Sequence, residues 1–176
     1  MKVLLGVLLT IILAQSARAQ SPTPPQTAKF DAKHPPRFED FPVTEKWNQP
    51  PAPLKLVTRS ERMFRTQLTN AAKEPPDFAG SYRFAGWGCG SACGAGAIID
   101  LKTGIVYPPP LGGKGEGAGR WVFCGGVFEG RYTEYRPDSR LVILRCAQIQ
   151  PYLPEVYYFV WEDHAFRLVL HLPPNK

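Results

Sequence analysis

Alternating apolar and polar residues run through the second half of the chain and predict a series of short β-strands. Tyr82 and Phe84 fall on one face of Ser81–Trp87, which is the period-two pattern of a half-buried strand. Leu141–Cys146 is apolar on both faces, so we expect it at the centre of a sheet. Further strands are predicted at 95–101, 105–107, 121–124, 127–128, 131–135, 156–161 and 166–170.

Turn residues separate these predicted strands. Gly88–Gly94 reads GCGSACG and predicts a glycine-rich turn between the first two strands. Gly104 closes a tight turn after Asp100, and we expect a positive φ at this glycine. Glu162–Ala165 joins the last two strands as a hairpin.

One helix is predicted, over Arg59–Lys73. Thr58 and Glu61 have the T-x-x-E spacing of a capping box, in which each side chain accepts a hydrogen bond from the other residue's backbone N–H. Pro75 ends the helix. The fold class is therefore α+β, mainly β: a single antiparallel sheet or meander with one N-terminal helix packed on it. The apolar stripe of that helix is Phe64, Leu68, Ala71 and Ala72.

Composition divides the chain into three parts. Residues 1–19 combine a basic start, a short apolar run and an Ala-x-Ala site, and predict a secretory signal peptide. Residues 20–56 are a proline-rich, extended and partly disordered leader. Residues 57–176 form the β-rich domain. We therefore expect an exported protein, periplasmic or secreted, without a transmembrane segment in its mature chain.

Four large apolar residues set the end of the leader apart from its beginning. A disordered tail seldom carries so many, so we expect this part to drape over the domain. A proline-rich ligand for a partner protein is the functional alternative, since polyproline II geometry suits such recognition. The four residues are Phe38, Phe41, Val43 and Trp47.

The formal net charge is +6, but the basic residues are scattered and form no Lys/Arg run. Nucleic acid is therefore not an expected partner. An acidic partner or an anionic envelope surface stays open.

Export changes the interpretation of the four cysteines, because thiols pair in an oxidising compartment. Four cysteines allow three pairings, and we favour Cys89–Cys93 with Cys124–Cys146. The first pair lies in a loop flexible enough to close a short bridge. A zinc site would need reduced thiols, and the C-x3-C spacing differs from the C-x2-C of a redox motif.

Leu111–Arg120 reads LGGKGEGAGR and predicts a mobile surface loop. It is not a phosphate-binding loop, because Lys114 is followed by glycine and not by Ser or Thr. We therefore expect no cofactor and no metal.

Several of these motifs occur together in a known pattern. The segments FAGSY, WGCGSAC, GAIIDLKTGIVY and YRPDSRL resemble a family of uncharacterised exported bacterial proteins, over roughly Phe64–Cys146. The resemblance implies export and a single β-rich domain. It brings no activity and no catalytic residues.

The sequence favours a small binding or inhibitory module of the bacterial envelope, with an envelope or extracellular ligand such as a protein. No catalytic constellation is evident, so enzymatic activity is an open question with the balance against it. The alternatives are a hydrolase or redox enzyme using Cys89 or Cys93, and a structural envelope protein. The candidate binding surface consists of residue types common at binding hot spots, together with a loop serine: Tyr82, Trp87, Ser91, Arg120 and Trp121. The alternative, favoured for most of these aromatic residues, is that they fill the core.

Overall fold

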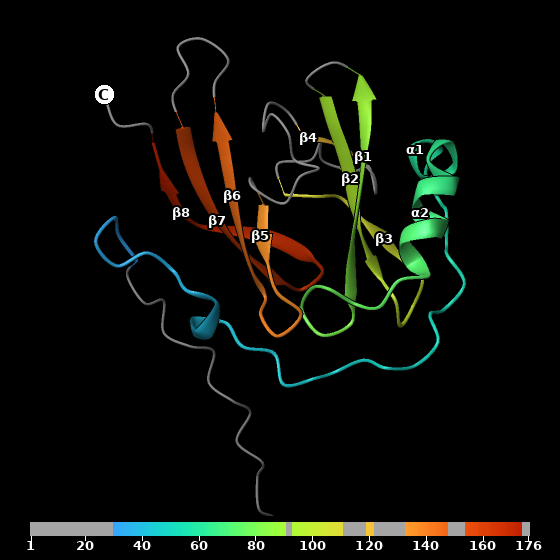
Figure 1. Cartoon of the computed structure of the whole chain (residues 1–176), viewed down its shortest axis with the longest axis horizontal. Helices are drawn as coiled ribbons and strands as arrows, with labels where there is room; N and C mark the ends of the chain where they lie inside the picture. The colour runs from blue at the N-terminus through green and yellow to red at the C-terminus, as the bar shows by residue number, and fades with distance from the viewer. Residues whose placement is uncertain (1–29, 91–92, 111–118, 122–132, 148–153, 174–176) are drawn as a thin grey trace, which may run out of the picture.

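The computed structural model describes residues 30–90, 93–110, 119–121, 133–147 and 154–173. These residues form two four-stranded antiparallel sheets and two short helices (Figure 1). The mainly β class is confirmed, but the prediction of a single sheet was wrong. No described helix is long and apolar enough to cross a membrane.

The first sheet is organised around β2, which pairs with every other strand of that sheet. The hairpin of β1 and β2 keeps a regular register from Tyr82 opposite Asp100 to Gly88 opposite Gly94. Both strands run further than predicted, into the expected glycine-rich turn. The strands are β1 (Tyr82–Gly90), β2 (Cys93–Asp100), β3 (Val106–Tyr107) and β4 (Gly119–Trp121).

The second sheet has the strand order β5-β6-β7-β8. The predicted central position of Leu141–Cys146 is confirmed, because β6 lies between β5 and β7. The predicted hairpin at 162–165 is also confirmed, with φ of 48° at Asp163 and 61° at His164. The strands are β5 (Thr133–Tyr135), β6 (Leu141–Ala147), β7 (Pro154–Glu162) and β8 (Ala165–Leu172).

Three predicted segments fall largely or wholly outside the described residues. They are the loop at 111–120 and the strands at 121–124 and 127–128. Only the last two residues of that loop, Gly119 and Arg120, are described, and they belong to β4. The strand predicted at 121–124 therefore begins two residues earlier.

The predicted helix is divided into α1 (Arg59–Met63) and α2 (Arg65–Ala72). Phe64 has φ −99° and ψ 23°, which lies outside the helical region and separates the two. The capping box is confirmed: the Glu61 N–H donates to Thr58 Oγ1 at 3.1 Å, and the Thr58 N–H donates to Glu61 Oε2 at 3.0 Å. The predicted stripe packs on the first sheet.

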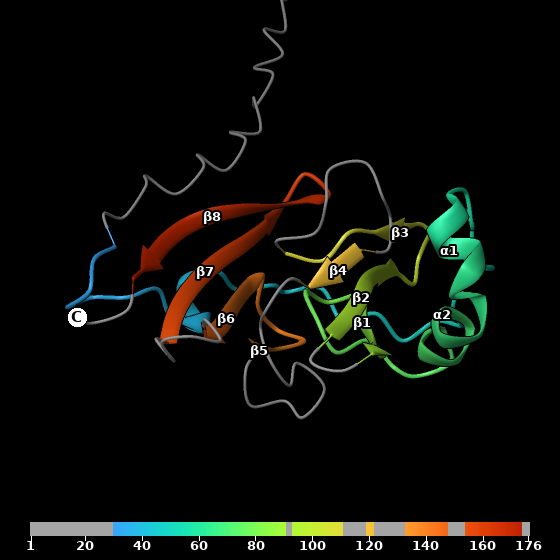
Figure 2. The same ribbon diagram turned by 90° about the horizontal axis from the view of Figure 1, so that it is seen from above.

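The elements stack in layers around three apolar clusters. The helices cover one face of the first sheet, around Leu68 and Trp87. The other face of that sheet meets the second sheet in a core rich in aromatic rings, centred on Phe78. The far face of the second sheet is covered by residues from the N-terminal part of the chain, around Phe41. Figures 1 and 2 show the helices at one end of the molecule and β8 towards the other.

Residues 30–57, here called the strap, cross the whole molecule beneath both sheets (Figure 1). The expectation that the aromatic part of the leader drapes over the domain is confirmed. Phe41 joins the cluster on the second sheet, Val43 packs against the core between the sheets, and Trp47 packs against the helix-covered cluster. One short 3-10 helix, η1 (Phe38–Asp40), interrupts the strap.

Two glycine turns hold the strap by backbone contacts. The Trp47 N–H donates to the Gly80 carbonyl at 3.1 Å, and the Lys55 N–H donates to the Gly104 carbonyl at 2.8 Å. Both glycines have positive φ, 82° and 74°, so the prediction for Gly104 is confirmed. A Cβ at Gly80 would lie 2.6 Å from the Glu45 carbonyl oxygen. The glycines of the FAGSY and KTGIVY segments are therefore the places where the strap touches the sheet turns.

Candidate functional site

The structure separates two residues of the predicted binding surface. Tyr82 and Trp87 differ by an odd number of positions on β1, so their side chains lie on opposite faces. Tyr82 is half-buried in the core between the sheets, and its hydroxyl lies 3.3 Å from His164 Nδ1. Trp87 is buried under the helices, with its ring 4.7 Å from that of Phe64. These two side chains do not form one exposed surface.

The other three residues of that surface are described only in part. Ser91 lies outside the described residues. Arg120 and Trp121 belong to β4, opposite Ala95 and Gly94 of β2, while their side chains lie outside the description. The backbone thus brings this end of β4 beside the start of β2, and a binding role for these three residues stays a prediction.

The backbone positions of two cysteines bear on the predicted pairing. The regular register of the β1–β2 hairpin, continued one pair beyond Gly88 and Gly94, would place Cys89 opposite Cys93. The register shifts at this point, and Gly90 lies opposite Cys93. Cys146 lies opposite Glu155 in the second sheet, and Cys124 is outside the described residues. The cysteine side chains are not described, so the pairing stays a prediction.

We expect no free thiol in the denatured, unreduced protein and four after reduction, because the cysteines of an exported chain pair. Trypsin cleaves after Lys and Arg, so one peptide, 84–102, contains both Cys89 and Cys93. Mass mapping without reduction should find this peptide two hydrogens lighter and linked to no other. A crosslink from it to a peptide containing Cys124 or Cys146 would contradict the pairing.

A stripe of glycines follows the core residues of the first sheet, on the face that meets the second sheet. Beyond Phe84 and Ile98, which are in the core between the sheets, the same face carries Gly86, Gly88, Gly94 and Gly96. We call these four the glycine stripe. Gly86 and Gly88 are exposed, and a Cβ built on Gly88 would meet no heavy atom of the described chain within 4 Å.

The second sheet also carries polar side chains beyond the core between the sheets. Glu155 and Tyr157 follow Phe159 at alternate positions of β7, so they continue the face that joins the core between the sheets. His171 of β8 lies directly opposite Tyr157. We call Glu155, Tyr157 and His171 the acid–histidine cluster.

Hydrogen bonds and ring stacking hold this cluster together. Glu155 Oε2 accepts a short hydrogen bond from the Tyr157 hydroxyl and lies 3.0 Å from His171 Nε2. The rings of Tyr157 and His171 stack with centroids 4.2 Å apart and 7° between their planes. Burial, followed by the hydrogen bond to Glu155, raises the pKa of Tyr157 to about 12. Tyr157 therefore stays a hydrogen-bond donor at neutral pH.

A β-bulge is what brings His171 into the cluster. The register of β7 and β8 shifts by one residue between Tyr158 and Phe159. Without this shift His171 would lie opposite Val156, on the other face of the sheet. The last predicted strand ends at position 170, so His171 was not expected to lie on a strand. The signal available was the Glu-x-Tyr spacing on β7, which predicts two polar groups on one face.

Thr133 lies on the same face of the second sheet as Tyr157. It lies opposite Leu144, which lies opposite Tyr157, so the apolar Leu144 separates the two polar side chains. Thr133 Oγ1 is buried and has no hydrogen-bond partner within the described chain. A buried hydroxyl without a partner costs stability.

A hollow lies where the strap passes the turns at 80 and 137. It has a volume of about 550 Å³. Backbone hydrogen bonds join the strap to the turns along its wall; for example, the Val43 N–H donates to the Asp138 carbonyl at 2.8 Å. Two of its charged groups are already paired, Arg136 with Glu39 at 3.0 Å and Glu45 with Lys102. We interpret this hollow as the junction where the strap packs on the sheets, and not as a ligand site.

Comparison with protein-family models, curated proteins and solved structures finds no match to this chain. The family resemblance therefore stays a prediction. Within the described residues no group of three or more His, Cys, Asp or Glu side chains could hold a metal ion. The candidate site therefore consists of the glycine stripe and the acid–histidine cluster, each of which continues the face of its own sheet beyond the shared core.

Proposed function

We propose that this protein is a small ligand-binding module of the bacterial envelope, and that its ligand binds between the glycine stripe and the acid–histidine cluster. The supporting observation is the open space beside the exposed Gly88 backbone. Glycine in a strand packs nothing and weakens it. Since no neighbour within the described chain needs the room at Gly88, access for a ligand explains this glycine better than packing does.

The chemistry of the two walls defines the class of ligand. Backbone without side chains lets a flat or extended group approach the sheet closely. The opposite wall carries Glu155, whose carboxylate accepts a hydrogen bond from the Tyr157 hydroxyl and contacts the His171 imidazole. The site suits a flat or extended polar ligand, such as a peptide segment.

A bulky side chain at Gly88 tests this proposal. Gly88→Leu should fold like the wild type because the position is exposed and open. It should lose binding because the leucine fills the space. A fragment library of peptide-like amides, screened by amide NMR shifts of the labelled protein, should perturb Gly86, Gly88 and His171 in the wild type, with at least a tenfold weaker affinity in the variant.

The matched control is Thr69→Leu, an equally exposed position on α2. It should bind the same fragments as the wild type. A screen in which no fragment shifts the stripe or the cluster, or in which Gly88→Leu binds as well as Thr69→Leu, would overturn the proposed site.

A further inference from the structure

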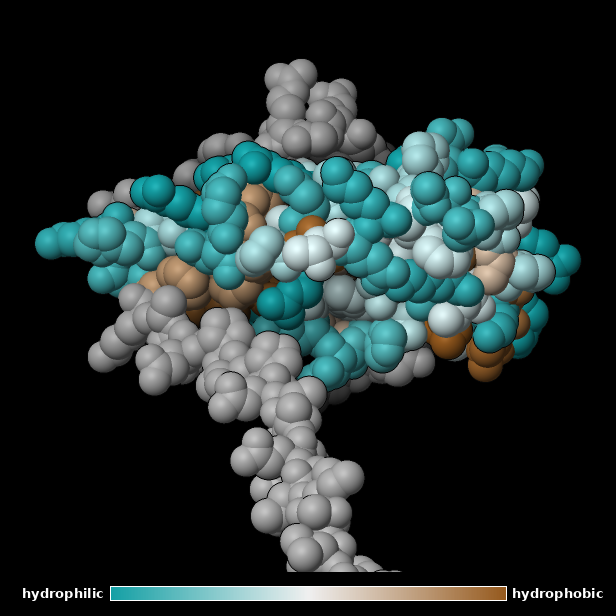
Figure 3. Space-filling view, turned by 90° about the horizontal axis from the view of Figure 1, so that it is seen from below, coloured by the Kyte–Doolittle hydropathy of each residue, from teal (hydrophilic) through white to brown (hydrophobic). Residues whose placement is uncertain are grey.

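Three of the four large hydrophobic side chains exposed in the described chain lie at its helical end. They are Val57, Met63 and Ile105, which are 74%, 65% and 36% exposed; the fourth is Leu168. Figure 3 shows hydrophobic surface at this right-hand end among hydrophilic residues. Single exposed hydrophobic residues are ordinary, so the question is whether these three form one surface.

Local geometry places them together with basic residues. Lys55 forms a parallel bridge with Ile105, so their side chains are neighbours on one side. Along the strap, positions 53, 55 and 57 are exposed while 54 and 56 are half-buried, so Lys55 and Val57 point outward together. The Arg62 guanidinium donates to the Val57 carbonyl.

Helix α1 continues this surface. Arg59, Arg62 and Met63 are three and four residues apart, which places them on one helix face, and all three are exposed. The opposite face carries the buried Glu61. We call Lys55, Val57, Arg59, Arg62, Met63 and Ile105 the basic–apolar surface.

The positive charge of this surface is not neutralised within the described chain. No carboxylate there forms an ion pair with Lys55, Arg59 or Arg62. The nearest acid in sequence, Glu61, is buried and accepts the backbone N–H groups of Val57 and Thr58. Three cations therefore face solvent around the protruding apolar side chains.

We infer that the basic–apolar surface docks on an anionic lipid membrane. Cations near a negatively charged bilayer gain Coulomb energy that depends on salt. Protruding apolar side chains such as Met63 and Val57 enter the boundary between headgroups and acyl chains. Apolar side chains surrounded by Lys and Arg can provide both the electrostatic attraction and the apolar insertion. This inference is independent of the proposed ligand site, which lies between the sheets.

An acidic protein partner fits the surface less well. A stable protein interface buries about 800 Å² on each side, around a closely packed apolar centre. Here the apolar groups are three separate side chains with cations between them. A membrane surface does not require a complementary shape, so three separate apolar side chains with neighbouring cations are enough for membrane binding.

Flotation with lipid vesicles tests the inference. The purified protein should float with vesicles of equal parts phosphatidylglycerol and phosphatidylcholine, and not with pure phosphatidylcholine. Each removed cation should weaken binding about fivefold at low salt, so Arg59→Gln with Arg62→Gln should weaken it about 30-fold. Met63→Ser should weaken it about tenfold through lost apolar burial. Raising the salt to about 1 M should abolish binding.

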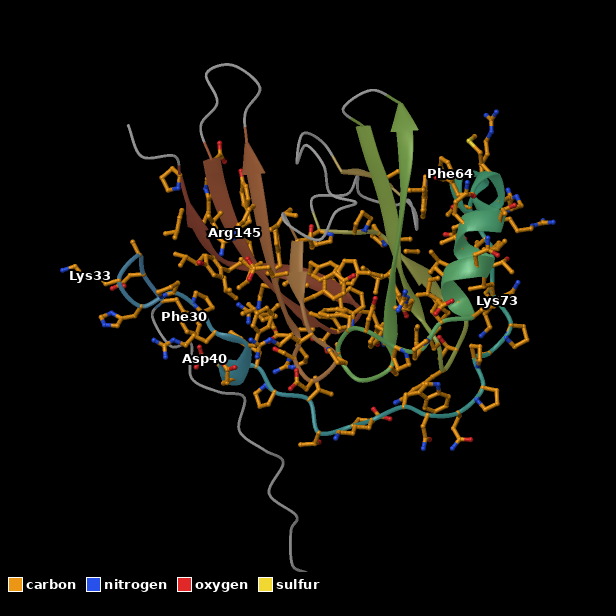
Figure 4. All side chains as sticks on the ribbon, in the orientation of Figure 1. Phe30, Lys33, Asp40, Phe64, Lys73 and Arg145 are labelled. Carbon is orange, nitrogen blue, oxygen red and sulfur yellow. The ribbon has the colours of Figure 1, made fainter. Side chains whose placement is uncertain are left out.

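The matched control carries the same loss of charge elsewhere. Lys33→Gln with Arg37→Gln removes two exposed cations at the opposite end of the molecule, where Figure 4 shows Lys33 far from Phe64. Its binding should fall less than twofold, and thermal unfolding should show all variants folded. Equal binding to neutral vesicles, no flotation, or equal losses in the two double variants would overturn the inference. Binding to an acidic protein with no flotation would replace the membrane with a protein partner.

Discussion

Replacing Phe78 by alanine should lower the free energy of unfolding by about 4 kcal/mol, within the range for large aromatic truncations in a core. Phe78 is fully buried. Its ring lies 5.0 Å from Phe84 of the first sheet and 6.0 Å from Phe166 of the second. Rings of Tyr82, Tyr135 and Trp161 lie within 6.4 Å. Its removal leaves a cavity that neither sheet can close alone.

Urea denaturation measures this loss as a shift of the unfolding midpoint. The matched control is Phe30→Ala, because Phe30 is only half-buried and its one ring contact within the described chain is with Phe41 at 5.7 Å. The free energy of unfolding of that variant should fall by about 1 kcal/mol, as expected for a partly buried side chain. If both variants lost the same amount, Phe78 would not be the link between the two sheets.

Replacing Gly104 by alanine should lower the free energy of unfolding by about 3 kcal/mol. About 1–2 kcal/mol of this comes from placing a residue with a Cβ in the left-handed backbone region. The rest comes from the strap. The new Cβ would stand 1.9 Å from the Pro53 carbonyl oxygen and 2.8 Å from its carbon, which no side-chain movement relieves. The strap must lift, and the hydrogen bond from the Lys55 N–H to the Gly104 carbonyl would break.

Two measurements separate this effect from general destabilisation. Denaturation should show the loss in Gly104→Ala and less than about 0.5 kcal/mol in Gly88→Ala, where the space is open. Limited trypsin digestion should cleave after Lys46 and Lys55 faster in Gly104→Ala, because a lifted strap exposes these sites. Unchanged cleavage would mean that Gly104 does not hold the strap.

The candidate site shows how far sequence reasoning reaches. Alternation on β7 could place Glu155 and Tyr157 on one face, because side-chain period in a strand depends only on the chain itself. It could not place His171 there. A single bulge decides which face the end of β8 presents, and its position depends on packing against neighbouring strands.

The interpretation of the aromatic residues shows the same limit. Tyr82 and Trp87 have the composition of a binding surface, yet both are packed in cores on opposite sides of one sheet. Residue type cannot distinguish a buried aromatic side chain from an exposed one. The helix break at Phe64 also escaped sequence reasoning, because its apolar stripe continues through both helices.

The sequence by itself determined most of the described strands, the capping box, the hairpin turn at 162–165 and the draped aromatic part of the strap. These follow from side-chain period, turn chemistry and the need to bury large apolar groups, which act over a few neighbouring residues. Only the tertiary structure decided that the strands divide into two sheets, that Gly80 and Gly104 hold the strap, and that His171 joins Glu155 and Tyr157 on one face. These depend on which distant segments pair, and therefore on contacts that no local pattern encodes.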